Sequence, residues 1–291
     1  MAFRNRVFSL FDVSLRDGLQ SLRRVVPLAD KQAMFREIVQ TRRPAAIEVG
    51  SLVSPKVLPQ MSGSDAMFRY ASEYVASNSL STDLYMAVPP TRYRLDAAFG
   101  LGVKNVSIMA SVSDAFQNAN VGMSCEDTHR IIVEESSSKR FDKMKVYLSC
   151  IEYCPVSGRF TDIEKMADAV CSYVFHSGIS EVCLSDTTGS MRASSAVMLM
   201  AALAERQVST KDIGVHLHKM GDNAAGVHRL GAIFLAAGVT KIDVSNLRTG
   251  GCSVTMEESD LHANTHYDDI EPIYVTAQCI GDSVRTMLPG C

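Results

Sequence analysis

The sequence has no apolar run near the roughly 18 to 20 residues that a membrane-spanning helix needs, so we expect no membrane segment. Strand-like residues begin near Arg6, which leaves no room for a signal or transit peptide, and we expect a cytoplasmic chain, or one written without its leader. An excess of one charge is also missing: 29 Lys and Arg stand against 32 Asp and Glu. The net charge of −3 gives no general attraction to nucleic acid or anionic membranes, so the expected partners are small molecules or protein.

A disulfide framework is missing as well. The eight cysteines of this 291-residue chain are scattered and lie mostly in apolar segments, which indicates reduced thiols. Cys150 and Cys154 have C-x3-C spacing, but no second pair accompanies them, so a zinc site is only weakly indicated. The basic stretch 139–145 contains Asp142 and no clustered aromatic residues, which favours a solvated helix end over a nucleic-acid patch.

The sequence does contain one pattern that is repeated eight times: a short β-rich run, a polar or glycine-containing break, and a longer segment with helical period. Alternating β and α units build a parallel sheet, and eight of them in about 250 residues are the count that closes a (β/α)8 barrel. The hydrophobic content of 46% is enough for a large core. The expected strands are 6–14, 45–51, 83–89, 105–112, 145–151, 180–186, 213–218 and 241–247.

We therefore predict an α/β fold, a TIM barrel, in a single domain spanning 1–291. The alternative is an open doubly wound sheet, which explains eight regular units less well, and no G-x-G-x-x-G follows the first expected strand.

Local signals set some of the expected helix boundaries. Helices are expected at 30–42 and 161–176, and Thr161 with Glu164 three residues later has the spacing of a capping box. Gly178 and Gly238 follow expected helices, at the position where a helix end prefers a left-handed residue.

Titratable side chains gather at the carboxyl ends of the expected strands, which is where (β/α)8 barrels carry their active sites. A purely structural core would avoid such groups, because an unpaired buried polar group costs free energy. The residues are Arg16 and Asp17, Glu48, Cys150, Asp186, His216 and His218, and Cys252 in a glycine-flanked loop after the eighth strand.

Two histidines give the sharpest chemical signal. His216 and His218 share one face of a strand, because side chains two residues apart point the same way. An isolated H-x-H is better explained by one core and one surface histidine, since so short a motif recurs by chance. Asp17 and Glu48 at neighbouring strand ends favour a divalent-metal site instead.

The other motifs each have a plainer alternative. Arg16 and Asp17 could simply form an ion pair beside a turn. Asp186 could cap the next helix through its carboxylate. Cys252 could be a spectator thiol, although its place between Gly251 and Ser253 predicts that it is more exposed than the other cysteines and reactive.

Six segments, in order and at similar spacing, resemble the HMG-CoA lyase branch of the DRE-TIM metallolyases, a superfamily that also holds isopropylmalate, homocitrate and citramalate synthases. The resemblance spans nearly the whole chain, and VSPKVLPQM is close to the lyases in particular. The segments are RDGLQ (16–20), SLVSPKVLPQM (51–61), YLSCIEYCP (147–155), LSDTTG (184–189), VHLH (215–218) and GGCS (250–253).

The resemblance implies a homodimeric barrel that cleaves a 3-hydroxy-3-methylglutaryl thioester into acetyl-CoA and acetoacetate. Such a retro-aldol step needs a base for the tertiary hydroxyl and an electrophile for the developing enolate, and a hard cation with a guanidinium supplies the second. By motif position, the implied ligands of Mg²⁺ or Mn²⁺ are Asp17, His216 and His218, and Arg16 would stabilise enolate charge.

Further roles follow from the same resemblance. Glu48 and Asp186 would shape the polar site. Cys252 would lie on a mobile loop, with Gly250 and Gly251 as hinges, and would share proton transfer with His216 and metal-bound groups. Closure would bring the Cys252 thiol near positive charge, which should favour the thiolate.

The chain departs from the family at three places. Arg23 stands where the lyases have a lysine that contacts the cofactor, and Lys219 follows the H-x-H where they have an acidic or amide residue. The asparagine expected as the fourth metal ligand is absent in register, so Asp260 is the nearest expected substitute and Asn264 the next.

The leading hypothesis is a metal-dependent carbon–carbon lyase acting on an acyl-CoA or a related 3-hydroxy acid. One alternative is a synthase that condenses an acyl-CoA with a 2-oxo acid, although such enzymes usually carry an extra region after the barrel. Another is a barrel that has lost efficient catalysis and binds a partner, which Lys219 and the altered loop after Cys252 suggest.

Overall fold

The structure is a computed structural model that describes residues 7–159, 162–221 and 224–287. Eight parallel strands pair in the order β10-β1-β2-β3-β4-β5-β8-β9, and β9 pairs again with β10, so the sheet closes on itself. The predicted TIM barrel is confirmed, because each expected strand range overlaps one observed strand. The strands are β1 Ser9–Asp12, β2 Ala46–Ser51, β3 Asp83–Val88, β4 Asn105–Ser111, β5 Lys143–Ser149, β8 Glu181–Asp186, β9 Ile213–Lys219 and β10 Lys241–Val244.

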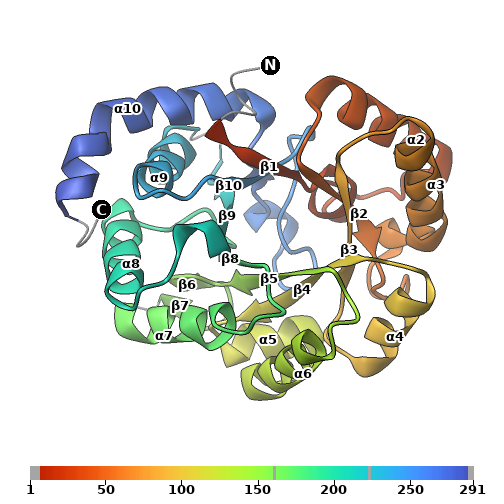
Figure 1. Cartoon of the computed structure of the whole chain (residues 1–291), viewed down its shortest axis with the longest axis horizontal. Coiled ribbons are helices and arrows are strands. Elements are labelled where there is room, and N and C mark those ends of the chain that lie inside the picture. The colour runs from red at the N-terminus through yellow and green to blue at the C-terminus, as the bar shows by residue number, and fades with distance from the viewer. Residues whose placement is uncertain (1–6, 160–161, 222–223, 288–291) are drawn as a thin grey trace.

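Helices surround the strands, as Figure 1 shows. Strands covered by helices on the outside and by packed side chains within the barrel are buried on both faces, and β2, for example, is buried at all six positions. No helix of the described residues is both long and apolar enough to cross a bilayer. The helices are α2 Leu28–Glu37, α3 Ser64–Ser77, α4 Arg92–Gly100, α5 Asp114–Val121, α6 Cys125–Ser138, α7 Ile163–Val174, α8 Ala193–Glu205, α9 Ala224–Ala236 and α10 Ile270–Thr286.

Short elements complete the loops. The antiparallel pair β6 (Tyr153–Cys154) and β7 (Gly158–Arg159) follows β5, and β11 (Ala263–Asn264) pairs antiparallel with the end of β9. The single turns of helix are η1 Ser14–Gly18, η2 Ile38–Arg42, η3 Pro59–Met61, η4 Thr210–Asp212, η5 Glu258–Asp260 and η6 Tyr267–Asp269.

The predicted helix boundaries are confirmed in part. The expected helix 30–42 corresponds to α2 continued by η2. The helix expected at 161–176 begins at Ile163, where the side chain of Asp162 accepts a hydrogen bond from the backbone N–H of Lys165 and caps it. Thr161, the expected capping residue, lies outside the described residues.

Gly238 and Gly178, the two glycines expected to end helices, differ in backbone conformation. Gly238 has φ +97°, so the expected left-handed exit is confirmed there. Gly178 has no positive φ, and that prediction is wrong. A Cβ at Gly178 would lie 2.0 Å from the carbonyl oxygen of Ser136, so glycine is required there because α6 lies too close for a side chain.

The barrel interior contains a buried cation. The side chain of Lys145 on β5 is 1% exposed, and its Nζ lies 2.5 Å from Asp243 Oδ1 on β10 and 3.0 Å from Glu181 Oε1 on β8. The ammonium also lies 3.7 Å from the centre of the Phe11 ring. Two carboxylates and an aromatic face therefore offset the cost of burying this charge.

Candidate functional site

A cavity of about 320 Å³ opens at the carboxyl ends of the strands. Barrels of this architecture carry their active sites at this end. The cavity collects side chains from η1, β4, β5, β8, β9, α4 and α5, and from the loops after β2, β3 and β10. Five of the predicted site residues line it: Arg16, Asp17, His216, His218 and Cys252.

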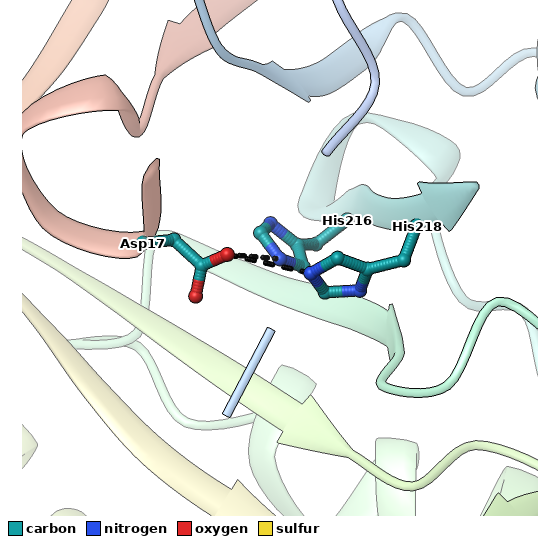
Figure 2. A group of neighbouring side chains, drawn as sticks. All are labelled: Asp17, His216 and His218. Carbon is teal, nitrogen blue, oxygen red and sulfur yellow. Dashed lines mark hydrogen bonds and ion pairs between the residues drawn. The ribbon is translucent and has the colours of Figure 1, made fainter. Parts of the chain in front are cut away.

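Asp17 and the two histidines converge, as predicted (Figure 2). Their candidate ligand atoms all lie within 4.8 Å of one another. Asp17 Oδ2 lies 3.3 Å from His218 Nε2 and 3.9 Å from His216 Nε2. Asp17 is positioned by the single helical turn η1 that directly follows β1, whereas both histidines project from the same face of β9.

Each histidine ring is oriented through its second nitrogen. His218 Nδ1 donates to the backbone carbonyl of Asp186 at 3.0 Å, and His216 Nδ1 lies 3.1 Å from the carboxylate of Asp243. A carbonyl can only accept, so His218 Nδ1 carries a proton. Nε2 then donates to Asp17 Oδ2 in the protonated ring, and in the neutral ring its lone pair is free for a cation. Histidines that ligate metals are commonly held in this way.

The pKa values of the cluster follow from burial and pairing. Burial raises the pKa of Asp17, but Arg16 and the two histidines outweigh it and hold the pKa well below its usual range. Burial lowers the pKa of His216, which keeps its imidazole neutral. Burial also opposes charging of His218, yet the hydrogen bond to Asp17 raises the pKa of that imidazole. A carboxylate beside imidazoles is a donor set that divalent cations accept.

The structure places the two candidates for the fourth ligand differently. Asp260 is exposed at the end of η5 and is not part of the cluster. Asn264 is buried instead, and its Nδ2 donates to Asp17 Oδ2 at 2.9 Å and to the carbonyl of Thr249 at 2.9 Å. Its Oδ1 is buried without a hydrogen-bond partner. The amide of Asn264 thus contacts the carboxylate of the cluster through its nitrogen, and its oxygen, a group that divalent cations accept as a ligand, has no hydrogen-bond partner among the described residues.

Arg16 forms the ion pair that was considered as its plainer role, and it also lines the cavity. Its Nη1 lies 2.6 Å from Asp17 Oδ1, and its Nε lies 2.5 Å from the fully buried carboxylate of Glu48. Burial disfavours the charge, but Glu48 and Asp17 raise the pKa of Arg16 well above its ordinary value. Its Nη2 is buried without a partner, so one donor of a permanently charged group remains available in the cavity wall.

Glu48 and Asp186 lie behind the cavity surface. Glu48 binds Arg16 and accepts the hydroxyl of Ser107, so it positions the guanidinium. The Asp186 carboxylate accepts the backbone N–H groups of Ser190 and Met191, both at 3.1 Å, in the turn before α8. This arrangement resembles the alternative in which the Asp186 carboxylate caps the next helix. Burial raises the pKa of Asp186 to about 6.

The loop after β10 packs against Asp17. Gly251 has φ +95°, and its N–H donates to Asp17 Oδ2 at 3.1 Å. A Cβ on Gly250 would lie 2.3 Å from Asn264 Nδ2. The two glycines therefore allow the backbone to approach the cluster closely, a role different from the hinge expected from the sequence.

Cys252 lines the cavity from this loop, and its Sγ lies 3.5 Å from Asn120 Oδ1. The expectation that it is more exposed than the other cysteines is wrong, because Cys252 is only partly exposed whereas Cys279 on α10 is exposed. Burial raises the pKa of the Cys252 thiol, so the protein groups around it do not favour the thiolate. The thiolate expected when the loop closes over a bound cation stays a prediction.

The two basic departures from the family pattern are both neutralised. Arg23 is 84% exposed, and its Nε and Nη2 lie 2.6 and 2.8 Å from the carboxylate of Glu258. Lys219 Nζ lies 2.6 Å from Asp269 Oδ2, and neither basic side chain lines the cavity. The added positive charge of Lys219 is thus compensated outside the metal-ligand cluster.

Sequence reasoning missed two residues that complete the site. Asp243 orients His216 and also accepts the hydroxyl of Tyr147 at 2.8 Å. Tyr147 lines the cavity with its ring 5.1 Å from the Arg16 guanidinium carbon. Both lie in expected strands, and a charged residue inside an apolar strand is the signal that could have indicated Asp243.

The protein is a closed parallel barrel with a candidate metal centre. A carboxylate, two imidazoles and a buried arginine form this centre at the carboxyl ends of the strands. The chain belongs to the HMGL-like family, whose model matches residues 7–258. It is 31% identical over 246 residues to hydroxymethylglutaryl-CoA lyase of Pseudomonas mevalonii, covering 84% of this chain and 77% of that protein.

Three further comparisons agree. The 3-hydroxy-3-isohexenylglutaryl-CoA/hydroxy-methylglutaryl-CoA lyase of Pseudomonas aeruginosa is 31% identical over 247 residues, with the same coverage of 84% and 77%. A crystal structure of hydroxymethylglutaryl-CoA lyase from Pseudomonas aeruginosa has a TM-score of 0.75 at 26% identity, covering 96% of this chain and 90% of that one. The Brucella melitensis HMG-CoA lyase structure, at 21% identity and a TM-score of 0.76, covers 96% and 95% and supports the fold.

Proposed function

We propose that the protein is a divalent-metal-dependent carbon–carbon lyase that cleaves a 3-hydroxyacyl-CoA such as HMG-CoA into acetyl-CoA and acetoacetate. The observation that carries this proposal is the buried group of Arg16, Asp17, His216 and His218 in one cavity wall. Membership of the HMGL-like family and the lyase relatives support it.

The proposed ligands of Mg²⁺ or Mn²⁺ are Asp17, His216, His218 and Asn264. When bound, the ion supplies an electrophile that polarises the oxygen atoms of the substrate. Arg16 holds a fixed positive charge toward the thioester oxygen on which enolate charge develops. Glu48 and Asp243 act one step away, since each orients a group that reaches the cavity.

The proposed reaction is a retro-aldol cleavage. The tertiary hydroxyl loses its proton, the adjacent C–C bond breaks, and its electron pair becomes the enolate of the acetyl thioester while the hydroxyl carbon becomes a ketone. Nε2 of His216 is a proposed metal ligand and Nδ1 lies against the Asp243 carboxylate, so we expect the hydroxyl proton to leave through groups beside His216 rather than onto a free nitrogen of its ring. Cys252 keeps its proton because burial raises the thiol pKa, and we assign it to protonation of the enolate carbon.

The resemblance also implies a homodimer in the cytoplasm, and we keep both, with a single catalytic domain, as part of the proposal. Light scattering would measure the assembly state. A monomer at working concentration would remove the dimer from it.

The test combines metal binding with product analysis. The protein with Mg²⁺ or Mn²⁺ is incubated with a panel of 3-hydroxyacyl-CoAs, and mass spectrometry is expected to detect acetyl-CoA and the matching 3-oxo acid. His216→Ala and His218→Ala are expected to lose both Mn²⁺ binding and turnover. The matched control is His129→Gln, since His129 lies on α6 outside the cavity and donates to the carbonyl of Ser172. Wild-type protein that binds Mn²⁺ but cleaves no member of the panel would contradict the proposed reaction.

A further inference from the structure

The cavity extends well beyond the reactive groups, and its outer part is apolar. The loops after β2 and β3 contribute Leu58 and Pro89 to its walls, and α5 contributes Phe116. Val57 and Val254 also line it and are 55% and 41% exposed, so they lie where the cavity meets solvent. A ligand that fills this space has a reactive end at Arg16 and an apolar middle part.

One basic side chain in this wall has no acidic partner. Arg94, the third residue of α4, lines the cavity and is partly buried. Its guanidinium carbon lies 5.3 Å from the centre of the Tyr93 ring, and no carboxylate of the described residues is within ion-pair distance. A guanidinium in a cavity wall without a carboxylate is suited to an anion on a ligand.

Neighbouring arginines make the contrast clear. Arg92 on the same helix pairs with Glu134 at 2.5 Å, and Arg140 pairs with Asp96 and Glu135. Arg16, at the reactive end of the cavity, is already bound by two carboxylates. Among the described residues that line the cavity, Arg94 is therefore the arginine whose charge no carboxylate balances.

Arg23, the residue expected from the sequence to contact the cofactor, is not available for that role. Arg23 is held by both oxygens of the Glu258 carboxylate and does not line the cavity. An anionic ligand would have to displace Glu258 before it could bind Arg23. The unpaired charge is instead that of Arg94, in the first turn of α4, which does line the cavity.

We propose that Arg94 binds an anionic group of the substrate that takes no part in the bond cleavage. This inference rests on the proposed function, in which the substrate is a 3-hydroxyacyl thioester that carries anions at both ends. The anion is either a phosphate of the CoA moiety or the free carboxylate of the acyl moiety, and both suit a guanidinium. Arg94 thereby sets substrate affinity, while Arg16 serves the reaction itself.

The experiment compares wild-type protein with Arg94→Met and with the matched control Arg92→Met. KM and kcat are measured with HMG-CoA and with the pantetheine thioester of the same acid, which keeps the carboxylate but lacks the phosphates. Loss of one charge-assisted contact is expected to raise KM for HMG-CoA about 10-fold or more, with kcat within about two-fold. Arg92→Met is expected to match wild type, and unchanged thermal midpoints would show that both variants fold.

The two thioesters identify the anion. If Arg94 binds a phosphate, Arg94→Met raises KM for the CoA thioester alone. If it binds the carboxylate, KM rises by a similar factor for both. Equal KM values for wild type, Arg94→Met and Arg92→Met with both substrates would overturn the proposal.

A binding measurement separates this inference from the proposed function. Calorimetric titration with free CoA and with 3-hydroxy-3-methylglutarate needs no turnover. Weaker binding of either compound to Arg94→Met than to wild type and Arg92→Met supports Arg94 even if neither thioester is cleaved. Identical binding to all three proteins, or no binding to wild type, refutes it.

Discussion

Replacing Arg16 by glutamine is expected to reduce both stability and catalysis, for two separable reasons. The Glu48 carboxylate is fully buried, and among the described residues its hydrogen-bond partners are Arg16 and the Ser107 hydroxyl. Removing one member of a buried ion pair costs about 3 to 5 kcal/mol, because the other charge is left uncompensated. Removing a charge donor at a developing oxyanion lowers kcat by roughly 10² to 10³.

The double variant Arg16→Gln/Glu48→Gln separates the two effects. With the buried carboxylate also neutralised, most of the lost stability is expected to return, whereas kcat stays low because no guanidinium faces the substrate. Urea denaturation measures the first effect, and steady-state kinetics with HMG-CoA the second. If activity recovers together with stability, Arg16 acts only as a structural partner of Glu48, and the assigned chemistry is refuted.

Three further predictions concern the surroundings of the site. Lys145→Met is expected to lower the free energy of unfolding by about 3 to 5 kcal/mol, because the buried Asp243 loses its cation. Adding Asp243→Asn should restore part of this free energy, and urea denaturation that shows no loss in the single variant would contradict the prediction. Gly250→Ala is expected to weaken Mn²⁺ binding roughly 10-fold in calorimetry, since its Cβ would displace Asn264, and unchanged affinity would remove Asn264 from the ligand set. Alkylation of Cys252 in metal-free protein is expected to be slow at pH 7 and to keep accelerating above pH 9, because burial raises the thiol pKa and only the thiolate reacts; peptide mapping that finds a rate plateau near neutral pH would refute that protonation state.

The barrel could be predicted from the sequence because its signal is repeated. Eight β-rich runs alternate with helical segments, and each run needs only local composition to be recognised. Predictions from the sequence failed where a contact with a residue far away in the chain determines the local conformation. Gly178 looks like a helix end, but the contact that requires glycine is with the backbone of Ser136, more than one element earlier in the chain.

The candidate site was predictable to a similar extent. Asp17, His216 and His218 were found because strand-end position and side-chain alternation bring them together. Asn264 was ranked behind Asp260, since counting along a loop gives no information on which residue returns to the barrel. The deciding contact is the pairing of β11 with β9, which aligns Asn264 with His218 and depends on the folded loop.

The interior ion pair of the barrel has a consequence for how this sequence can vary. Lys145, Asp243 and His216 form one continuous set of contacts from the barrel floor to the metal-ligand cluster. A neutral residue at Lys145 leaves Asp243 uncompensated, and a neutral residue at Asp243 releases the ring of His216. In related barrels these positions are therefore expected to change together, so that a charge is gained or lost as a pair rather than singly.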